Sequence, residues 1–374
     1  MLQNSPLIHN KVAVTGQHQQ MLSSVLKLFN IRPDYNLQVM AENQDLSTLT
    51  TKILTGLATL FEQYKPHLVL VHGDTTTLAA SISAYYHQIP IAHIEAGLRT
   101  GDINSPWPEE ANRKITSVLA SIHFAPTEQS QVNLLREGVP PHKIFVTGNT
   151  VIDALYDAVN IIETQPLISA ALRQAFSFIK PDRKMILMTG HRRENFGKGL
   201  EQICHALVHL AKLFPEVDII YPVHLNPNVQ KPVRGILDGI SNIHLIDPQD
   251  YLPFVFLMQS AYIILTDSGG IQEEAPSLGK PVLLLRSTTE RPEAIAAGTV
   301  RLVGTATEAI VSNVVQLLTD KQAYERMSGL KNPYGDGNAS ARIVQEICKL
   351  LVDTNLTLLK QDVAIPCAHE FSFF

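Results

Sequence analysis

The sequence predicts an α/β protein in which two parallel sheets are each covered by helices on both faces. Short, strongly apolar runs alternate with segments of helical periodicity along nearly the whole chain. Strands of a parallel sheet have this composition because both of their sides pack against helices. The chain has 374 residues, enough for two domains of ordinary size, and its two halves repeat one α/β pattern.

In the first half, each predicted strand is a short apolar run that separates two helical segments. The strands are Lys11–Thr15, His67–His72, Ile89–Ile94, His123–Ala125 and Ile144–Thr147. The periodicity between them predicts helices at Gln20–Phe29, Asp45–Tyr64, Thr77–His87, Glu109–Ala120, Glu128–Glu137 and Val151–Ile162. We therefore predict an N-terminal domain over residues 1–163.

The second half repeats the pattern after a proline-bracketed join. Pro166 and Pro181 bracket the expected linker, residues 164–181. Strands are predicted at Met185–Met188, Asp218–Val223, Ile243–Ile246, Tyr262–Leu265, Pro281–Leu285 and Val300–Val303. These form a second domain over 182–338. A final helix follows over 339–352, and the tail 353–374 has no clear periodicity and is expected to be loosely ordered.

Composition excludes several classes of partner. Charged residues make up 17% of the chain and the formal net charge is −5, so no basic excess attracts nucleic acid or a membrane surface. The widely spaced Cys204, Cys348 and Cys367 form no metal-type cluster and suit a reducing cytoplasm. No apolar run reaches the roughly 18–20 residues of a membrane span, and residues 1–6 do not resemble a signal peptide. We expect an intracellular protein with a small-molecule partner.

Two strings of the second half indicate a phosphate site. Gly190–Asn195 and Asp267–Glu274 each follow an apolar run and precede a helical segment. This strand–turn–helix arrangement leaves unpaired backbone N–H groups that bind phosphate. Glu274 lies one turn beyond the glycines, where a carboxylate suits the two hydroxyls of a ribose. The pattern is typical of proteins that handle nucleotide diphosphates, and nucleotide sugars in particular.

Acids mark the strand ends of the first half. Asp74 and Glu95 each follow a predicted strand, and Glu109 follows Pro106-Trp107-Pro108. Any one of them also suits a helix cap or first turn. Carboxylates gathered at one sheet edge raise each other's pKa and suit proton transfer. In the second half, His191 and His224 end strands without metal-type spacing, which favours phosphate contact or proton transfer.

Taken together, the strings resemble the non-hydrolysing UDP-N-acetylglucosamine 2-epimerases. The matching stretches are HGDTTT (72–77), IEAGLRTGD (94–102), SPWPEEANR (105–113), GHRREN (190–195), PVHLNP (222–227) and TDSGGIQEEAPSLGKPVL (266–283). The resemblance implies two Rossmann-like domains facing a central cleft, the GT-B type, with the C-terminal helix crossing back to the first domain. It also implies reversible C2 epimerisation of UDP-N-acetylglucosamine (UDP-GlcNAc) to UDP-N-acetylmannosamine (UDP-ManNAc), by elimination and re-addition of UDP.

The resemblance assigns roles to matching positions. It implies catalytic roles for Asp74, Glu95, Glu109 and His191. The UDP-binding positions are Gln249, Phe254, Ser268, Gly269, Gly270, Glu274 and Arg291, and His224 is placed in the cleft. Gln17 and His18 match an activating second UDP-GlcNAc site of some members. The resemblance also implies a homodimer and a role in cell-envelope polysaccharide synthesis. We expect UDP-GlcNAc, UDP-ManNAc and UDP as ligands, with no cofactor and no metal.

The chain departs from the family pattern at its start. Family members begin with a strand and a glycine loop, roughly FGTRPEAIK, where this chain has only Met1 to Asn10. We therefore expect an incomplete first sheet and weaker diphosphate binding. Two alternatives stay open: a hydrolysing 2-epimerase that releases ManNAc, and a catalytically impaired UDP-sugar-binding protein. The product distinguishes the first, and a loss of turnover with UDP binding retained identifies the second.

Overall fold

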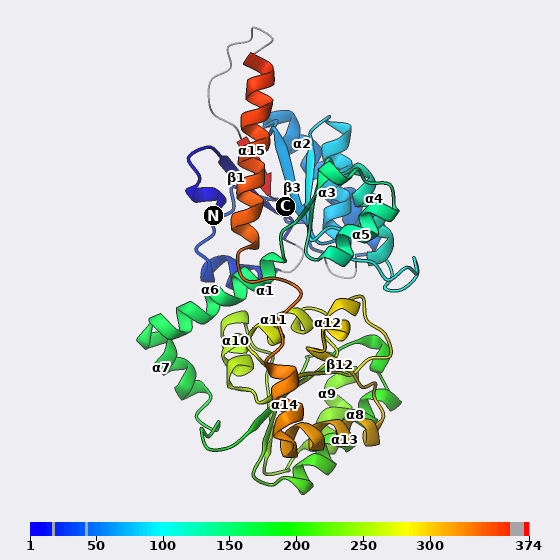
Figure 1. Cartoon of the computed structure of the whole chain (residues 1–374), viewed down its shortest axis with the longest axis vertical. Coiled ribbons are helices and arrows are strands. Elements are labelled where there is room, and N and C mark those ends of the chain that lie inside the picture. The colour runs from blue at the N-terminus through cyan, green and yellow to red at the C-terminus, as the bar shows by residue number, and fades with distance from the viewer. Residues whose placement is uncertain (17–18, 42–43, 360–369, 374) are drawn as a thin grey trace. The chain divides into compact units, whose positions relative to one another are not determined.

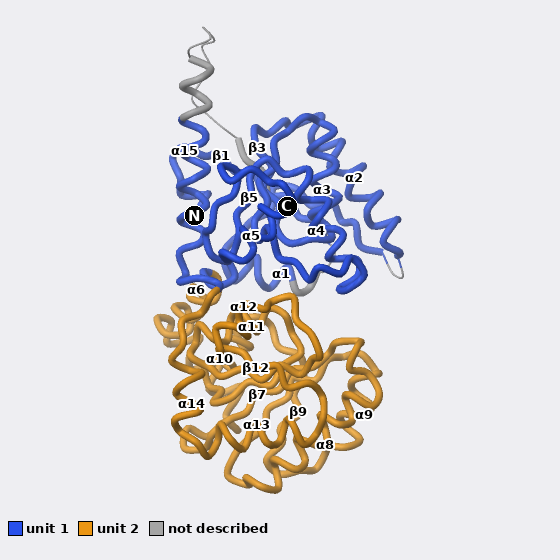
Figure 2. The backbone as a smooth tube through the Cα atoms, turned by 45° about the vertical axis from the view of Figure 1, so that its right-hand side comes forward, with its two compact units in different colours: residues 1–153, 334–374 blue, residues 154–333 orange. Residues whose placement is uncertain are grey.

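The computed structural model describes residues 1–16, 19–41, 44–359 and 370–373 (Figure 1). The chain divides into two compact units (Figure 2). Unit 1 comprises Met1–Asp153 together with Tyr334–Phe374, and unit 2 comprises Ala154–Pro333. The boundary falls inside the helix α6 (Thr150–Thr164), and the chain returns to unit 1 before its last helix.

The described part of unit 1 contains a seven-stranded parallel sheet with the order β2-β1-β13-β3-β4-β5-β6. The strands are β1 (His9–Val14), β2 (Tyr35–Asn36), β3 (Leu68–His72), β4 (Ile91–Ile94), β5 (Ile122–Ala125), β6 (Ile144–Val146) and β13 (Glu370–Phe373). The helices are α1 (Gln19–Leu28), α2 (Leu46–Gln63), α3 (Thr75–Tyr86), α4 (Glu109–Leu119), α5 (Glu128–Arg136) and α15 (Ala339–Leu359).

Unit 2 contains a six-stranded parallel sheet with the order β12-β11-β10-β7-β8-β9. The strands are β7 (Met185–Thr189), β8 (Asp218–Pro222), β9 (Ile243–Ile246), β10 (Ile263–Thr266), β11 (Val282–Leu284) and β12 (Val300–Leu302). The helices are α7 (Pro166–Ala175), α8 (Lys198–Leu213), α9 (Pro227–Leu237), α10 (Tyr251–Ser260), α11 (Ile271–Ser277), α12 (Pro292–Ala297), α13 (Thr307–Thr319) and α14 (Lys321–Ser328). The predicted pair of parallel sheets is confirmed.

The core of unit 2 explains why its strands are apolar on both sides. Ile186 and Met188 of β7 pack in one cluster with Leu207 of α8, while Leu187, between them on the strand, is also fully buried. Alternate side chains of a strand point to opposite faces of the sheet. Both faces are therefore covered, and the strand carboxyl ends are left as the edge at which polar residues gather.

The last helix belongs to the core of unit 1, as the predicted crossover requires. Ile343 and Ile347 of α15 pack with Leu70 of β3 and Phe124 of β5. Asp153 accepts hydrogen bonds from the N–H groups of the first two residues of α15, at 3.1 and 2.7 Å. This carboxylate caps the helix start, so the chain is fastened to unit 1 where it re-enters it.

The C-terminal region differs from expectation. Helix α15 continues to Leu359, beyond the predicted end at residue 352. Strand β13 pairs in parallel with β1 on one side and with β3 on the other. The expected incomplete first sheet is therefore wrong: in the described residues the order from β2 to β6 is continuous.

The segment 164–181, predicted as the linker between the domains, contains the helix α7. Pro166 is the first residue of α7. Proline suits this position because its fixed φ is helical and the missing N–H has no acceptor in the first turn. None of the helices in the described residues combines the length and the apolar character that a membrane span requires.

Candidate active site

In unit 1, two of the predicted acids follow neighbouring strands. β3 and β4 pair in parallel with His72 opposite Ile94. Asp74 comes two residues after His72, and Glu95 comes directly after Ile94. The structure therefore brings both carboxylates to the same carboxyl edge of the sheet, where open α/β sheets bind ligands.

Asp74 is both a helix cap and an ion-pair partner. Its Oδ1 accepts a hydrogen bond of 2.6 Å from the N–H of Thr75, the first residue of α3. Its Oδ2 lies 3.3 Å from the guanidinium of Arg113. The capping role considered from the sequence is thus present, and it leaves the carboxylate about one quarter exposed, with 28% of its side chain accessible.

Glu95 has an unusual backbone conformation. Its φ of 69° lies in the left-handed region, which residues other than Gly, Asn and Asp rarely adopt. Such a residue costs on the order of 1–3 kcal/mol and persists where the surroundings impose it. The next glycine shows how tight the turn is, because a Cβ on Gly97 would lie 2.3 Å from the carbonyl oxygen of Ser130. The Glu95 carboxylate lies 3.3 Å from His72 Nε2.

Glu109 begins α4, and one of its oxygens lacks a partner. Oε2 of Glu109 is buried and makes no hydrogen bond to any described residue. Buried carboxylate oxygens are normally hydrogen-bonded, so an unpaired one calls for an explanation such as a catalytic role or a missing ligand. Helix α4 packs against α3, the helix that Asp74 caps.

In unit 2, Asp267 organises the segment Gly190–Asn195. Its buried carboxylate accepts hydrogen bonds from the backbone N–H groups of His191, at 3.0 Å, and Arg192, at 2.9 Å. It also accepts from the side-chain amide of Asn195, at 3.1 Å. The two phosphate-type strings found in the sequence are therefore joined through one carboxylate.

The two histidines predicted at strand ends of the second half, His191 and His224, lie together. The rings of His191 and His224 stack with their centroids 5.7 Å apart and an interplanar angle of 19°. Burial lowers the pKa of His191 below its usual value, and the nearby Asp267 acts in the opposite direction. A neutral imidazole of this kind both donates and accepts hydrogen bonds, which suits phosphate contact and proton transfer.

The turn Ser268–Gly270 carries two backbone N–H groups, of Gly269 and Gly270, that have no partner among the described residues. Arg291 lies directly over this turn, because a Cβ on Gly269 would lie 2.6 Å from Arg291 Nη1. The guanidinium of Arg291 is held by the carboxylates of Glu273 and Glu290. A side chain at position 269 would displace these side-chain ends, so glycine allows the cation to approach the turn this closely.

Glu274, the predicted ribose carboxylate, is almost fully buried on α11. Tyr251, the first residue of α10, donates a hydrogen bond of 2.7 Å to its Oε1. Burial is the largest effect on the pKa of Glu274 and raises it to about 7, while the Tyr251 hydrogen bond lowers it. Sequence reasoning missed Tyr251, because nothing in a spacing of 23 residues indicates the contact.

The remaining predicted ligand residues fall as follows. Gln249 precedes α10 and donates a 2.7 Å hydrogen bond to the carbonyl of Asp247, and Phe254 lies in the first turn of α10, half-buried. Gln17 and His18, the candidate activator contacts, lie outside the described residues. Among the described side chains, no group of three or more His, Cys, Asp or Glu is arranged to hold a metal ion.

Two Rossmann-like units, one with acids at its strand ends and one with a glycine turn beside a buried carboxylate, define a nucleotide-sugar enzyme of the GT-B class. Comparison with known proteins narrows this class. The family model described as UDP-N-acetylglucosamine 2-epimerase matches residues 1–348, and the chain belongs to this family. The family resemblance predicted from the motif strings is confirmed.

Individual relatives match nearly the whole chain. The UDP-N-acetylglucosamine 2-epimerase of Yersinia pestis is 58% identical over 353 residues, which cover 92% of this chain and 94% of that protein. The enzyme of the same name from Escherichia coli K12 is 57% identical and covers 92% of each chain. The crystal structure of UDP-GlcNAc 2-epimerase from Neisseria meningitidis, bound to UDP-GlcNAc, superimposes with a TM-score of 0.89 at 54% identity, over 93% of this chain and 94% of that chain.

Proposed function

We propose that this chain interconverts UDP-GlcNAc and UDP-ManNAc by eliminating UDP and adding it back. The observation that carries this proposal is the set of carboxylates at the unit 1 sheet edge, in a chain 57% identical over 347 residues to an enzyme named for this reaction. A protein that only binds a UDP-sugar has no need of a strained acid such as Glu95 or of an unpartnered buried oxygen such as that of Glu109.

The reaction needs a base at C2 and a stabilised leaving group at C1. A carboxylate takes the C2 proton while the C1–O bond to the diphosphate breaks, which releases UDP and leaves 2-acetamidoglucal. Delivery of a proton to the opposite face of C2, with return of the diphosphate oxygen to C1, gives the epimer. We assign the proton transfers to Asp74, Glu95 and Glu109, because each is a strand-end or helix-start carboxylate of unit 1.

Unit 2 is assigned to the UDP moiety. The free N–H groups of Gly269 and Gly270 and the guanidinium of Arg291 suit the diphosphate, whose charge grows as the C1–O bond breaks. His191 is a neutral donor for the same group. The carboxylate of Glu274 accepts hydrogen bonds from the ribose hydroxyls, and Gln249 and Phe254 contact the uracil ring.

The test is to incubate the purified chain with UDP-GlcNAc in deuterated water and to follow the C2 proton by NMR. We expect loss of the C2 proton signal and appearance of UDP-ManNAc. Free ManNAc with UDP would instead identify the hydrolysing reaction. Retained UDP binding on titration without any exchange at C2 would overturn the enzymatic proposal in favour of a UDP-sugar-binding protein.

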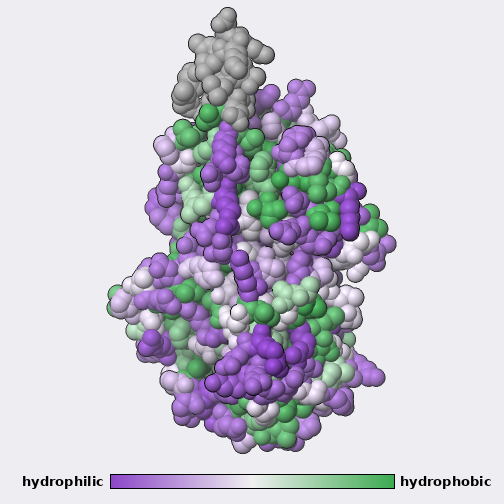
Figure 3. All heavy atoms as spheres, viewed as in Figure 1, coloured by the Kyte–Doolittle hydropathy of each residue, from purple (hydrophilic) through white to green (hydrophobic). Residues whose placement is uncertain are grey.

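We further propose that the chain forms a homodimer through α3 and α4. Figure 3 shows apolar side chains on the face of unit 1 where α3 and α4 lie. The exposed large hydrophobic residues of these two helices are Tyr85, Tyr86, Ile115 and Val118, of which Val118 is 83% exposed. Contiguous exposed apolar surface of this kind marks protein contacts. Light scattering should give a dimer, and the double substitution Tyr86→Lys with Val118→Lys should give a monomer. Leu167→Lys, at an equally exposed apolar position of α7, is the matched control.

The cellular setting is also a proposal. The free thiols of Cys204 and Cys348 are compatible with a reducing cytoplasm. We infer that the product enters the synthesis of a cell-envelope polysaccharide. Fractionation of the source cells, together with loss of a ManNAc-containing polymer on deletion of the gene, would test both points.

A further inference from the structure

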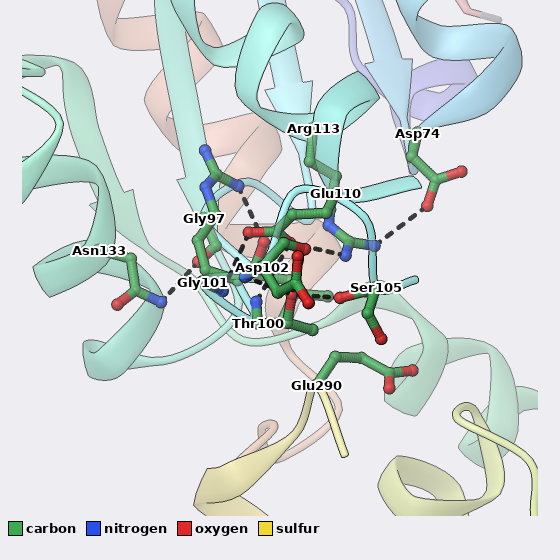
Figure 4. A network of polar contacts seen from close by, with 12 residues as sticks. Asp74, Gly97, Thr100, Gly101, Asp102, Ser105, Glu110, Arg113, Asn133 and Glu290 are labelled. Carbon is green, nitrogen blue, oxygen red and sulfur yellow. Dashed lines mark hydrogen bonds and ion pairs between the residues drawn. The ribbon is translucent and has the colours of Figure 1, made fainter. Parts of the chain in front are cut away.

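A fully buried carboxylate lies beside the candidate acids of unit 1. The side chain of Glu110, the second residue of α4, is 0% exposed. It accepts hydrogen bonds from the N–H groups of Thr100, at 3.1 Å, and Gly101, at 3.2 Å (Figure 4). A buried charge is tolerated only where it is paired and hydrogen-bonded, so this carboxylate requires a cation.

Arg113 supplies that cation and also contacts Asp74. Its Nη2 donates to Glu110 Oε2 at 3.0 Å, three residues away on the same helix. Its Nη1 donates to Asp74 Oδ2 at 3.3 Å, on the far side of the guanidinium from Glu110 (Figure 4). The planar guanidinium thus bridges a buried carboxylate and a partly exposed one, a geometry that its fixed fork of donors permits and that a lysine does not reproduce.

The second oxygen of Asp74 is held from the other side. Thr75 donates to Oδ1 through its backbone N–H, at 2.6 Å, and through its hydroxyl, at 3.1 Å. The amide of Asn112 lies 3.4 Å from the same hydroxyl. Both oxygens of Asp74 are therefore oriented, one by the start of α3 and the other by Arg113, and these contacts restrain rotation of the carboxylate.

We propose that Arg113 and Glu110 are positioning residues that orient the Asp74 carboxylate for proton transfer, with Glu110 also fastening the Thr100–Gly101 turn to the same helix. This inference rests on the proposed function. The network joins the three unit 1 strings 72–77, 94–102 and 105–113, because Arg113 contacts Asp74 and Glu110, while Glu110 contacts the Thr100–Gly101 turn. A pair that only neutralised Glu110 would not need to reach Asp74.

The experiment compares variants in the epimerisation assay and by UDP titration. Glu110→Gln combined with Arg113→Met removes both buried charges together, so neither is left unpaired. We expect kcat to fall on the order of 10²-fold, because misplacement of a catalytic group by about 1 Å has that effect. UDP affinity should stay within about twofold, because the UDP-binding residues lie in unit 2. Arg113→Lys, which retains the charge, should recover part of the loss.

Two comparisons separate positioning from a purely structural role. In an Asp74→Asn background, the double substitution should change kcat by less than about threefold, because residues that act as a unit are not additive. The matched control is Arg183→Lys, at the ion pair of Arg183 with Asp218 in unit 2, which should leave kcat unchanged. A loss of kcat of equal size in both backgrounds, or no loss at all, would overturn the proposal.

If the wild-type chain shows no epimerisation, that result contradicts the proposed function but leaves the positioning role of Arg113 to be tested. Crystal structures of the wild type and of the Glu110→Gln, Arg113→Met variant then decide. We expect the Asp74 carboxylate to move by more than about 0.5 Å, the tolerance of a catalytic geometry. An unmoved carboxylate would show that Arg113 does not position it.

Discussion

At the residue scale, the three candidate acids of unit 1 are held in three different ways. Asp74 is oriented at both oxygens, Glu95 is placed by a left-handed backbone, and Glu109 has a buried oxygen without a partner among the described residues. Environments that differ between neighbouring carboxylates allow one to act as an acid while another acts as a base. The contacts therefore support a division of roles that the sequence alone does not show.

Substitution of these acids should affect turnover far more than binding. Asp74→Asn and Glu109→Gln should each lower kcat by about 10²–10⁴-fold, the usual contribution of a general acid or base. UDP affinity should remain unchanged, because proton handling is a transition-state role. Steady-state kinetics and calorimetric titration measure the two quantities. Glu128→Gln is the matched control, since Glu128 begins α5 as Glu109 begins α4, and unchanged turnover in an acid variant would remove that acid from the mechanism.

The affinity for UDP should rise with pH through about 7. Glu274 has a pKa raised to about 7 by burial, so it is protonated below that pH and ionised above it. Only the ionised carboxylate accepts hydrogen bonds from both ribose hydroxyls with full strength. Titration of UDP at pH 6 and pH 8 should show tighter binding at the higher pH. Glu274→Gln should weaken binding and remove the part of this pH dependence that does not come from UDP itself; an identical pH profile would contradict the ribose assignment.

The site could be predicted from sequence where a residue type stands at a strand end, and not where a contact is tertiary. Asp74 and Glu274 could be predicted because each stands in a motif that directly follows a predicted strand. Arg113 lies in the matching stretch 105–113, three residues after Glu110, a spacing that favours a helical ion pair. Its contact with Asp74, in contrast, depends on how α3 and α4 pack. The bond from Tyr251 to Glu274 likewise depends on the packing of α10 beside α11.

At the element scale, the predicted strands and helices of both halves begin within two residues of where the structure begins them. The strand Ile243–Ile246 agrees at both ends, because turn residues bound it. Helix α3 begins at Thr75, two residues before the predicted Thr77, since the Asp74 cap satisfies the first N–H. Strand β13 escaped prediction because a four-residue strand that pairs with β1 and β3 carries too little pattern of its own.

Parallel pairing of β4 with β5 places two buried histidines opposite each other, and this should make the protein sensitive to acid. His93 and His123 are register partners, and burial lowers the pKa of His93 to about 3 and that of His123 to about 4. In the unfolded chain both take up a proton near pH 6.5. Between these values the unfolded state binds more protons, so this contribution to stability is present above pH 6.5 and is lost as the pH falls.

Urea unfolding at pH 7.5, 6.0 and 5.0 measures this effect. The wild-type midpoint should fall as the pH decreases, and His123→Gln should show a smaller fall because one of the two linked groups is gone. His142→Gln, at an exposed position, should retain the wild-type dependence. Equal pH dependence in His123→Gln and the wild type would show that the buried histidine is not linked to unfolding.

At the scale of the whole molecule, the chain leaves unit 1 inside α6 and returns to it at Tyr334, before α15, so unit 1 is built from both ends of the sequence. This path could be predicted from the family resemblance. Composition and periodicity alone predict a final helix but do not indicate the unit against which it packs. The return has an energetic consequence, because α15 supplies Ile343 and Ile347 to the cluster that includes Leu70 of β3. The strand that leads to Asp74 therefore depends on a helix about 270 residues later in the chain.

Truncation of Ile347 should destabilise unit 1 and spare unit 2. Ile347 is 1% exposed, and Ile→Ala in a packed core costs about 2–5 kcal/mol through lost burial and the cavity left behind. Hydrogen exchange should therefore speed up in β3 and β5, which share its cluster, and stay unchanged in β7 and β10 of unit 2. Val352→Ala, on the same helix but 47% exposed, is the control and should leave both units as they are. Faster exchange in β7 and β10 as well would mean that the two units unfold together, and that the crossover helix stabilises the whole chain instead of the unit into which it packs.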